Sequence, residues 1–322
     1  MKVLFVYSGN KKAGISPFVK SQGESLIKAG IELDYFPILG HGIFGYIRAI
    51  IQLRKYLKLK KYDIIHAHYA LSGWVALLAK KRTPILISLM GDDAYGTYDE
   101  HGKVKILSYL LILTSKLLQP FVSAIIVKSK NIYKTVWFKN KTAIIPNGVD
   151  INQFIKIDKK IARNKLNLPI EKKMVVYLAN PKESRKNIVL AKKAINISDM
   201  EDSFLVPYPI KHEDIAMMLS AADVLLSTST AEGSSNLIKE AMSCGCPIVS
   251  TDVGDVQWVL GNTEGCFLTS FDPKDVSLKL LKAIEFSTTN DRTNGRDRIL
   301  ELGLDLESTA NNLFLVYQKV LS

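Results

Sequence analysis

The sequence predicts an α/β protein made of two Rossmann-like domains. The chain has 322 residues, which is too long for one ordinary core and comfortable for two domains. Short apolar blocks rich in Val and Ile alternate with helical patterns, as in the βαβ units of a parallel sheet. This alternation stops at a polar, lysine-rich stretch and then starts again. The two series therefore indicate two sheets.

The first series predicts an N-terminal domain over residues 1–155. The helix between its first two strands is clearly delimited, because Ser16 suits the N-cap, Pro17 suits the first helical position and Gly30 follows the last turn. The strands are expected at residues 2–7, 31–37, 63–68, 85–90, 124–128 and 142–146.

The second series predicts a second Rossmann-like domain over residues 156–304. Its strands are expected at residues 174–179, 203–206, 223–227, 247–252 and 266–269. Residues 305–322 predict a terminal helix with one apolar stripe, and no strand follows it. The stripe consists of Leu306, Ala310, Leu313, Tyr317 and Val320.

Positive charge is concentrated in the first half of the chain. Residues 1–150 contain 22 Lys and Arg against 9 Asp and Glu, whereas the remainder contains 21 against 22. No recognisable nucleic-acid motif accompanies this charge, so we expect no nucleic acid partner. An anionic membrane or a phosphate-bearing substrate fits the basic half.

One basic helical pattern follows Ile43 and Phe44 and carries Arg54, Lys55 and Lys58 without an acid. This arrangement is expected of a helix that rests on an anionic membrane, with the lysine stems extended toward the interface. The alternative is an ordinary helix that packs on the core and has a solvated face.

The cysteines and apolar runs favour a cytoplasmic protein. Cys244, Cys246 and Cys266 lie in one short stretch without partners elsewhere, which indicates a reducing compartment and no disulfide framework. The apolar run at residues 2–7 is too short for a signal peptide. The longest apolar stretch, residues 106–127, is interrupted by a lysine, a glutamine and a proline, so we expect at most peripheral membrane contact.

The most informative segment runs from residue 222 to residue 250. A predicted strand leads into a turn with Glu232 and Gly233, and the helix that follows carries Glu240. Open α/β sheets bind ligands at the carboxyl ends of their strands, and N–H groups at a helix start attract phosphate. Gly233 permits close approach of the backbone. The two carboxylates can accept hydrogen bonds from separate hydroxyls of one elongated ligand; solvated helix charges are the alternative.

This segment resembles the signature of the family 4 retaining glycosyltransferases, in which two glutamates are separated by seven residues. The resemblance implies the GT-B fold, with a central cleft and a C-terminal helix that crosses back to the first domain. It implies that Glu232 contacts the donor sugar and that Glu240 binds the ribose of the nucleotide. It also places four following residues near the sugar and diphosphate, namely Gly233, Ser234, Ser235 and Asn236. Residues 63–68 and 145–150 resemble further family segments, so the likeness covers almost the whole chain.

The chain departs from the family pattern at two positions. The family places an Arg and a later Lys against the donor diphosphate; Lys186 matches the Lys, but Asn180 stands where the Arg is expected. Arg185 or Lys182 is expected to compensate, because a diphosphate leaving group needs cationic stabilisation without a metal. A solvated helix start is the alternative for Arg185 and Lys186.

The second departure lies beside Asp93, which matches the acid of the family. Met90 replaces the His that many members carry there. The front-face retaining mechanism of the family does not need this His, because the leaving phosphate takes the acceptor proton. In the first loop the glycines do not form the dinucleotide fingerprint, which disfavours an NAD enzyme. In family terms Gly14 approaches the donor phosphates; a plain turn is the alternative.

His66 and His68 lie on one predicted strand, and we expect them to face opposite sides of the sheet. They would then not bind one metal together. One would face the cleft and the other would be packed, and a structural role for both is the default.

The sequence therefore predicts a retaining glycosyltransferase that moves a sugar from a UDP- or GDP-sugar to a saccharide or polyprenyl-linked acceptor in surface polysaccharide synthesis. No cofactor and no metal are expected. A sugar-nucleotide epimerase or hydrolase with the GT-B fold, and a basic membrane-associated scaffold, are the alternatives. The expected catalytic residues are Glu232, Asp93 and Lys186, and the expected acceptor or membrane side is His68, Arg54, Lys55 and Lys58.

Overall fold

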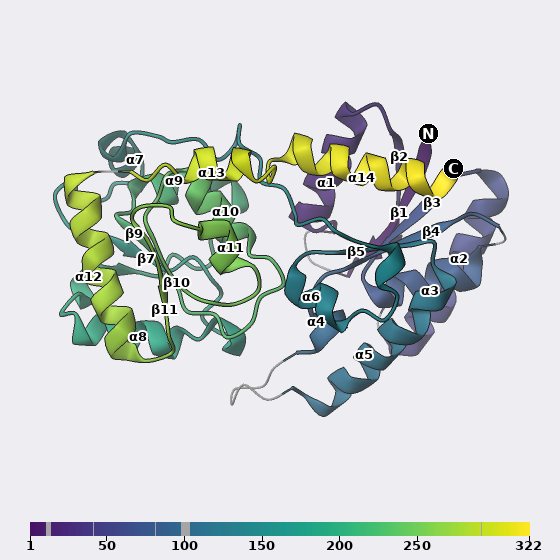
Figure 1. Cartoon of the computed structure of the whole chain (residues 1–322), viewed down its shortest axis with the longest axis horizontal. Helices are drawn as coiled ribbons and strands as arrows, with labels where there is room; N and C mark the ends of the chain where they lie inside the picture. Colours follow the sequence, from purple (N-terminus) through teal and green to yellow (C-terminus); the bar gives the residue numbers. More distant parts are fainter. Residues whose placement is uncertain (11–13, 41, 81, 98–103, 291) are drawn as a thin grey trace. The chain divides into compact units, whose positions relative to one another are not determined.

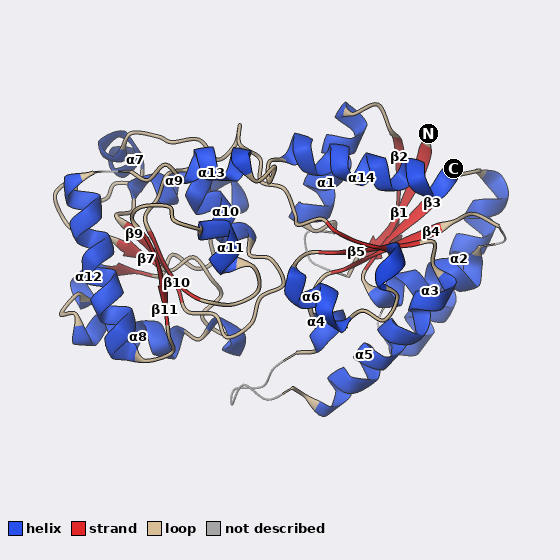
Figure 2. Ribbon diagram, in the orientation of Figure 1, coloured by secondary structure: helices blue, strands red, loops and turns tan. Residues whose placement is uncertain are grey.

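The computed structural model describes residues 1–10, 14–40, 42–80, 82–97, 104–290 and 292–322. The chain forms two α/β units, each with its own parallel sheet (Figures 1 and 2). The N-terminal unit comprises Met1–Thr97, Val104–Gly148 and Leu306–Ser322, and the C-terminal unit comprises Val149–Asp305. The predicted fold class, two parallel sheets covered by helices, is confirmed.

The described sheet of the N-terminal unit has the strand order β2-β1-β3-β4-β5-β6, and all its neighbours are parallel. Val and Ile dominate its inner strands, which are buried on both faces as the apolar blocks predict. The strands are β1 (Lys2–Ser8), β2 (Glu32–Ile38), β3 (Ile64–His68), β4 (Ile85–Leu89), β5 (Ala124–Val127) and β6 (Thr142–Ile144).

Helices cover both faces of this sheet. Alternate residues of a strand point to opposite faces, so Leu4 packs with α2 and α3, whereas Phe5 packs with α1 and α14. Figure 1 shows α14, the terminal helix, beside α1 on the same face. The helices are α1 (Pro17–Lys28), α2 (Gly42–Leu59), α3 (Ala70–Ala79), α4 (Asp92–Tyr95), α5 (Ile106–Leu118), α6 (Lys130–Thr135) and α14 (Leu306–Leu321).

The prediction that His66 and His68 face opposite sides of the sheet is wrong. Residues two apart on a strand share a face, and the two rings stack with centroids 4.5 Å apart. His66 Nδ1 lies 2.7 Å from the hydroxyl oxygen of Tyr317, and its Nε2 lies 2.8 Å from the hydroxyl oxygen of Ser88. Burial, aided by the charge of Lys128, lowers the pKa of His66 to about 3. A neutral His66 thus links α14 to the sheet.

The described sheet of the C-terminal unit has the strand order β11-β10-β9-β7-β8, again parallel throughout. Each strand lies within its predicted block, but β7 and β8 are only two residues long. The strands are β7 (Val175–Val176), β8 (Phe204–Leu205), β9 (Val224–Ser227), β10 (Ile248–Thr251) and β11 (Cys266–Thr269). The helices are α7 (Lys159–Lys165), α8 (Ile188–Ile197), α9 (Ile215–Ala221), α10 (Asn236–Ser243), α11 (Val256–Leu260), α12 (Pro273–Thr289) and α13 (Gly295–Glu301).

The strand order positions a binding site in the C-terminal unit. Its first strand, β7, lies between its second strand, β8, and its third strand, β9. The connections that leave β7 and β9 therefore run in opposite directions, and ligands of such sheets bind in the crevice outside the carboxyl ends at this point. Functional side chains are therefore expected in the loops that follow β7 and β9.

Candidate active site

The side chain of Glu232, in the loop after β9, lies between two cations from the loop after β7. Its Oε1 is 2.5 Å from Lys186 Nζ, and its Oε2 is 2.9 Å from Arg185 Nη1. The carboxylate is 11% exposed, and the two cations are 19% and 30% exposed. Glu183 also pairs with Arg185, with 2.5 Å between its Oε1 and Arg185 Nε. A half-buried cluster of two cations and two carboxylates is thus formed at the point where the strand order predicts a ligand.

The electrostatics of the cluster keep Glu232 ionised. Burial alone would raise the pKa of Glu232, but the neighbouring charges of Lys186 and Arg185 outweigh it, and the pKa lies below its ordinary value. The carboxylate is therefore negative at neutral pH. The two carboxylates, Glu232 and Glu183, balance the two cations, and an anionic ligand group would compete with them for Lys186 and Arg185.

Hydrogen bonds to backbone carbonyls hold the loop that carries Arg185 and Lys186. The N–H of Thr230 donates to the carbonyl of Arg185 over 2.8 Å, and the hydroxyl of Tyr177 donates to the carbonyl of Lys186 over 2.7 Å. Asn187 follows with a positive φ of 53° and caps α8 with its side chain. These hydrogen bonds fix the backbone on both sides of Lys186, so the two cations are held in position beside Glu232.

Gly254, in the loop after β10, packs directly against Glu232. It has a φ of +66°, and a Cβ at this position would lie 2.7 Å from the carbonyl oxygen of Glu232 and 3.1 Å from that of Gly233. Only glycine adopts this conformation at little cost and allows such close approach. Gly254 is not among the predicted site residues, although it lies just after a predicted strand end, where ligands bind.

Glu240 is buried on α10 and meets His212 from the turn that follows β8. The distance from Glu240 Oε1 to His212 Nε2 is 3.0 Å, and Phe154 packs edge-on against the imidazole with centroids 5.5 Å apart. The hydrogen bond to Glu240 raises the pKa of His212, although burial opposes it. His212 is not among the predicted site residues, because nothing in its local pattern marks it as a partner of a residue 28 positions away.

Lys239 adds a buried cation behind the start of α10. Its side chain is wholly buried, and its Nζ donates to the hydroxyl of Ser234 over 2.9 Å. Burial lowers the pKa of Lys239, while the nearby carboxylates of Asp255 and Glu240 oppose this. Ser235 precedes α10, and the buried Oδ1 of Asn236 has no hydrogen-bond partner among the described residues. The predicted phosphate-side residues thus line one helix start, with a positive charge behind them.

The remaining predicted site residues lie in the N-terminal unit. Asp93 is completely buried, and its oxygens accept hydrogen bonds from the backbone N–H groups of Ala70, Met90 and Gly91. Burial raises its pKa to about 6, against the effect of these hydrogen bonds. This placement favours a role in positioning the turn around Met90 over direct contact with a substrate.

Gly14 and His68 are two further predicted residues of this unit. Gly14 has a φ of +71°, which favours glycine, and a Cβ there would meet no atom within 4 Å. His68 is buried, and both its ring nitrogens lack hydrogen-bond partners among the described residues. Arg54, Lys55 and Lys58 lie exposed on α2. Asn180 and Lys182 precede the site, and Lys182 is exposed, so Arg185 is the cation that lies beside Lys186 and Glu232.

Among the residues that the structure describes, no group of three or more His, Cys, Asp or Glu side chains could hold a metal ion. Within the same part of the chain, every helix is too short or too polar to cross a membrane.

Two family models match the chain, one for each half. The model described as Glycosyltransferase Family 4 matches residues 14–153, and the model described as Glycosyl transferases group 1 matches residues 171–285. The second match contains both loops of the Glu232 cluster.

Curated relatives are distant glycosyltransferases. A teichuronic acid biosynthesis glycosyltransferase of Bacillus subtilis, TuaC, is 23% identical over 62% of this chain and 55% of its own length. A UDP-Gal:α-D-GlcNAc-diphosphoundecaprenol α-1,3-galactosyltransferase of Escherichia coli is 23% identical over 73% of this chain and 69% of its own length. The chain thus spans little more than half the length of TuaC.

Solved structures share the fold over nearly the whole chain. The sucrose-phosphate synthase of Thermosynechococcus elongatus has a TM-score of 0.78 at 22% identity and covers 99% of this chain and 98% of its own. Anabaena HepE in complex with UDP and glucose has a TM-score of 0.77 at 16% identity and covers 99% of both chains. The family models, this shared fold and the spacing of Glu232 and Glu240 all point to the same family. The chain belongs to the family 4 glycosyltransferases with the two-domain GT-B fold.

Proposed function

We propose that this protein is a retaining, metal-independent glycosyltransferase. It transfers a sugar from a nucleoside diphosphate sugar to a saccharide or lipid-linked saccharide in the synthesis of a surface polysaccharide. The observation that carries this proposal is the cluster of Lys186, Arg185 and Glu232 at the carboxyl ends of β7 and β9.

The charges of the cluster suit a diphosphate leaving group. When the bond between sugar and phosphate breaks, negative charge grows on the phosphate oxygens, and Lys186 and Arg185 offset it. Donors that are already in place need no reorganisation during the reaction, and removing one such donor typically slows catalysis about 10²–10³-fold. Arg185 takes over the charge that Asn180 does not supply. The two cations provide the stabilisation that a metal gives elsewhere.

The carboxylates hold the rest of the donor. Glu232 lies beside the leaving group and contacts the sugar, and its ionised state lets it accept hydrogen bonds from hydroxyls. Glu240 accepts hydrogen bonds from the ribose, and His212 positions its carboxylate. The N–H groups at the start of α10 face the diphosphate, and the buried charge of Lys239 adds to their field. Position 90, which is Met90, needs no side chain that transfers a proton, because the leaving phosphate takes the proton of the acceptor hydroxyl.

The printed names of similar proteins support the donor and acceptor classes. HepE has been solved with UDP and glucose, and the Escherichia coli relative is named for a UDP-galactose donor and a diphosphoundecaprenol-linked acceptor. TuaC is named for teichuronic acid biosynthesis. A uridine diphosphate sugar and a polyprenyl-linked saccharide are therefore the first substrates to test.

A turnover assay tests this proposal. Release of nucleoside diphosphate is measured from a panel of UDP- and GDP-sugars with and without polyprenyl diphosphate saccharides, in EDTA and in magnesium. We expect acceptor-dependent release in both buffers, an α-linked product from an α-linked donor by NMR, and a loss of at least about 100-fold in Glu232→Gln. Glu285→Gln, an exposed glutamate on α12, is the control. Turnover without an acceptor would instead indicate the epimerase or hydrolase, and inversion would contradict the retaining mechanism.

A further inference from the structure

Helix α5 exposes an apolar stripe that the proposed transfer reaction does not use. Five large apolar side chains, between 46% and 88% exposed, recur at helical spacing along one side of it. They are Ile106, Tyr109, Leu110, Leu113 and Leu117. Exposed apolar side chains that are contiguous rather than scattered mark an interaction surface.

Helix α2 exposes a second stripe of the same kind. Ile43, Phe44, Ile47 and Ile51 are between 47% and 82% exposed. The same side of the helix then continues with Arg54, Lys55 and Lys58, which lie three, four and seven residues beyond Ile51. The exposed side of α2 thus changes from apolar to cationic along its length.

The two helices belong to one face of the N-terminal unit. Helix α3 packs against both α2 and α5, and Figures 1 and 2 show the three helices on the side of the sheet opposite α1 and α14. We call the exposed apolar residues of α2 and α5 just given, together with Arg54, Lys55 and Lys58, the α2–α5 face.

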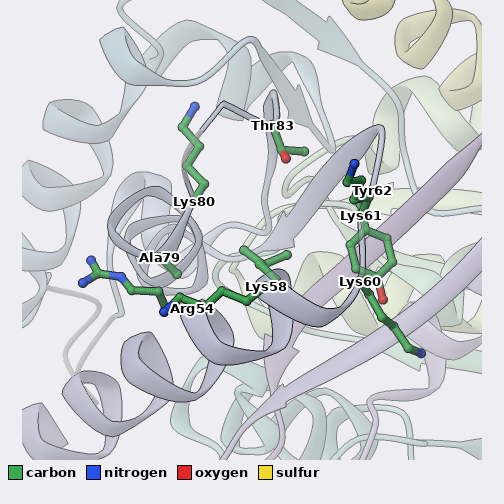
Figure 3. A pocket seen from close by; sticks show the side chains of 9 residues that line it. Arg54, Lys58, Lys60, Lys61, Tyr62, Ala79, Lys80 and Thr83 are labelled. Atoms are coloured by element: carbon green, nitrogen blue, oxygen red, sulfur yellow. The ribbon is translucent and has the colours of Figure 1, made fainter.

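A cationic hollow lies at one end of this face. It has a volume of about 610 Å³ and is bordered by the end of α2, the end of α3 and the segments that lead into β3 and β4. Figure 3 shows long basic side chains from both helices around it, among them Arg54 and Lys58 from α2 and Lys80 from the end of α3. Its lining residues are Arg54, Leu57, Lys58, Lys60, Lys61, Tyr62, Ala79, Lys80 and Thr83, which include five cations and no acid.

Three of these cations are available to an anion. Lys60 lies 3.1 Å from Asp34, and Arg54 donates to the carbonyl of Leu78. Among the residues described, no carboxylate lies within ion-pair distance of Lys58, Lys61 or Lys80, and burial lowers the pKa of Lys80. A negative ligand group would offset this concentration of positive charge.

The chemistry of the face selects an anionic lipid surface as its occupant. The sequence contains no Asp or Glu from residue 42 to residue 61 or from residue 104 to residue 118. A protein partner or a second copy of the chain would have to present an apolar surface with acidic residues that complement the cations of this face. A partner surface that is apolar alone would not account for these cations. Apolar side chains beside an acid-free cationic rim match the boundary between acyl chains and anionic headgroups.

We infer that the α2–α5 face docks on an anionic membrane. Phe44 and the stripe of α5 enter the boundary between headgroups and acyl chains, and the hollow takes lipid phosphate groups between Lys58, Lys61 and Lys80. This site lies in the N-terminal unit and involves none of the donor-site residues, so it stands independently of the transfer reaction.

Vesicle flotation of the full chain tests the inference without any nucleotide. Vesicles contain phosphatidylcholine alone or with 30% phosphatidylglycerol. We expect binding only to the anionic vesicles, with a steep loss as salt is raised. Lys58→Gln with Lys61→Gln should weaken binding about 25-fold, or about fivefold for each charge. Phe44→Gln with Leu110→Gln should weaken it at least about tenfold.

Matched controls use the opposite face of the same unit. Lys20→Gln with Lys319→Gln removes two exposed charges from α1 and α14, and Leu315→Gln removes an exposed leucine from α14. These variants should bind vesicles like the wild type, and all variants should keep its thermal midpoint.

Other results overturn the inference. If neutral vesicles bind equally, or the controls weaken binding as much as the test variants, the α2–α5 face is not the docking surface. If inorganic phosphate raises the thermal midpoint through Lys58 and Lys61 while no vesicle binds, the hollow takes a soluble anion. If Phe44→Gln with Leu110→Gln converts a dimer to a monomer by light scattering and leaves vesicle binding unchanged, the face joins two copies of the chain.

Discussion

Gly254→Ala tests how closely the backbone around Glu232 is set. A Cβ at this position would lie 2.7 Å from the carbonyl oxygen of Glu232, and ordinary contacts begin at about 3.4 Å, so one of the two loops has to move by about 0.7 Å. The positive φ adds strain of about 1–2 kcal/mol, because L side chains disfavour the left-handed region. The substitution should therefore cost both stability and alignment of the carboxylate.

The expected loss of activity follows from the displacement. A misplacement of about 1 Å at reacting groups can slow an enzyme about 10²-fold, so a 0.7 Å shift should lower kcat about 10- to 100-fold. Steady-state release of nucleoside diphosphate measures kcat, and thermal denaturation measures the loss of stability. Far-UV circular dichroism should show an unchanged secondary structure.

Gly30→Ala separates strain from displacement. Gly30 has a φ of +85°, and a Cβ there would meet no atom within 4 Å. This variant should lose a comparable 1–2 kcal/mol of stability and keep its kcat. The reasoning is refuted if Gly254→Ala keeps the wild-type kcat, or if Gly30→Ala loses as much activity as Gly254→Ala does.

Three further predictions concern single charges. Lys186→Gln should lower kcat about 10²–10³-fold, because it removes a cation that stabilises the leaving group. An unchanged kcat would show that Lys186 has no part in the mechanism. Asp223→Asn should lower the free energy of unfolding in urea by about 3–5 kcal/mol, because the buried Arg163, 2.8 Å away, loses its carboxylate and keeps only backbone carbonyls as acceptors; a loss below about 1 kcal/mol would contradict this. The bond to Glu240 raises the pKa of His212, so this pair stabilises the fold fully below about pH 6.5 and less as the pH rises through the raised value. His212→Ala should remove this part of the pH dependence of the thermal midpoint, and an identical profile would argue against the pair.

Much of the fold is readable from the sequence because buried parallel strands form apolar blocks. The five strands of the C-terminal unit lie inside their predicted blocks, although β7 shrinks to two residues. Backbone pairing sets strand ends, and apolar content alone does not reveal where pairing stops. The error at His66 and His68 was one of geometry, since residues two apart on a strand share a face.

The candidate site is less readable. The turn with Glu232 and the helix with Glu240 stand out because the residues that carry the chemistry are adjacent in the chain. Gly254 and His212 contact these glutamates only through the fold, so no local pattern marks them. Lys239 looks like a solvated helix charge in the sequence, and its complete burial depends on how α10 packs against the rest of the unit.

Isothermal titration calorimetry of UDP, GDP and ADP in EDTA tests the donor site most directly. We expect one nucleotide to bind the wild type and Glu285→Ala equally well, and Glu240→Ala and Lys186→Gln each to weaken this binding at least about tenfold. Removing one charged hydrogen-bond partner of a buried group costs about 1.5–3 kcal/mol, which corresponds to that loss. If no nucleotide binds in EDTA or in magnesium, or if both site variants bind like the wild type, the donor is not held by this cluster.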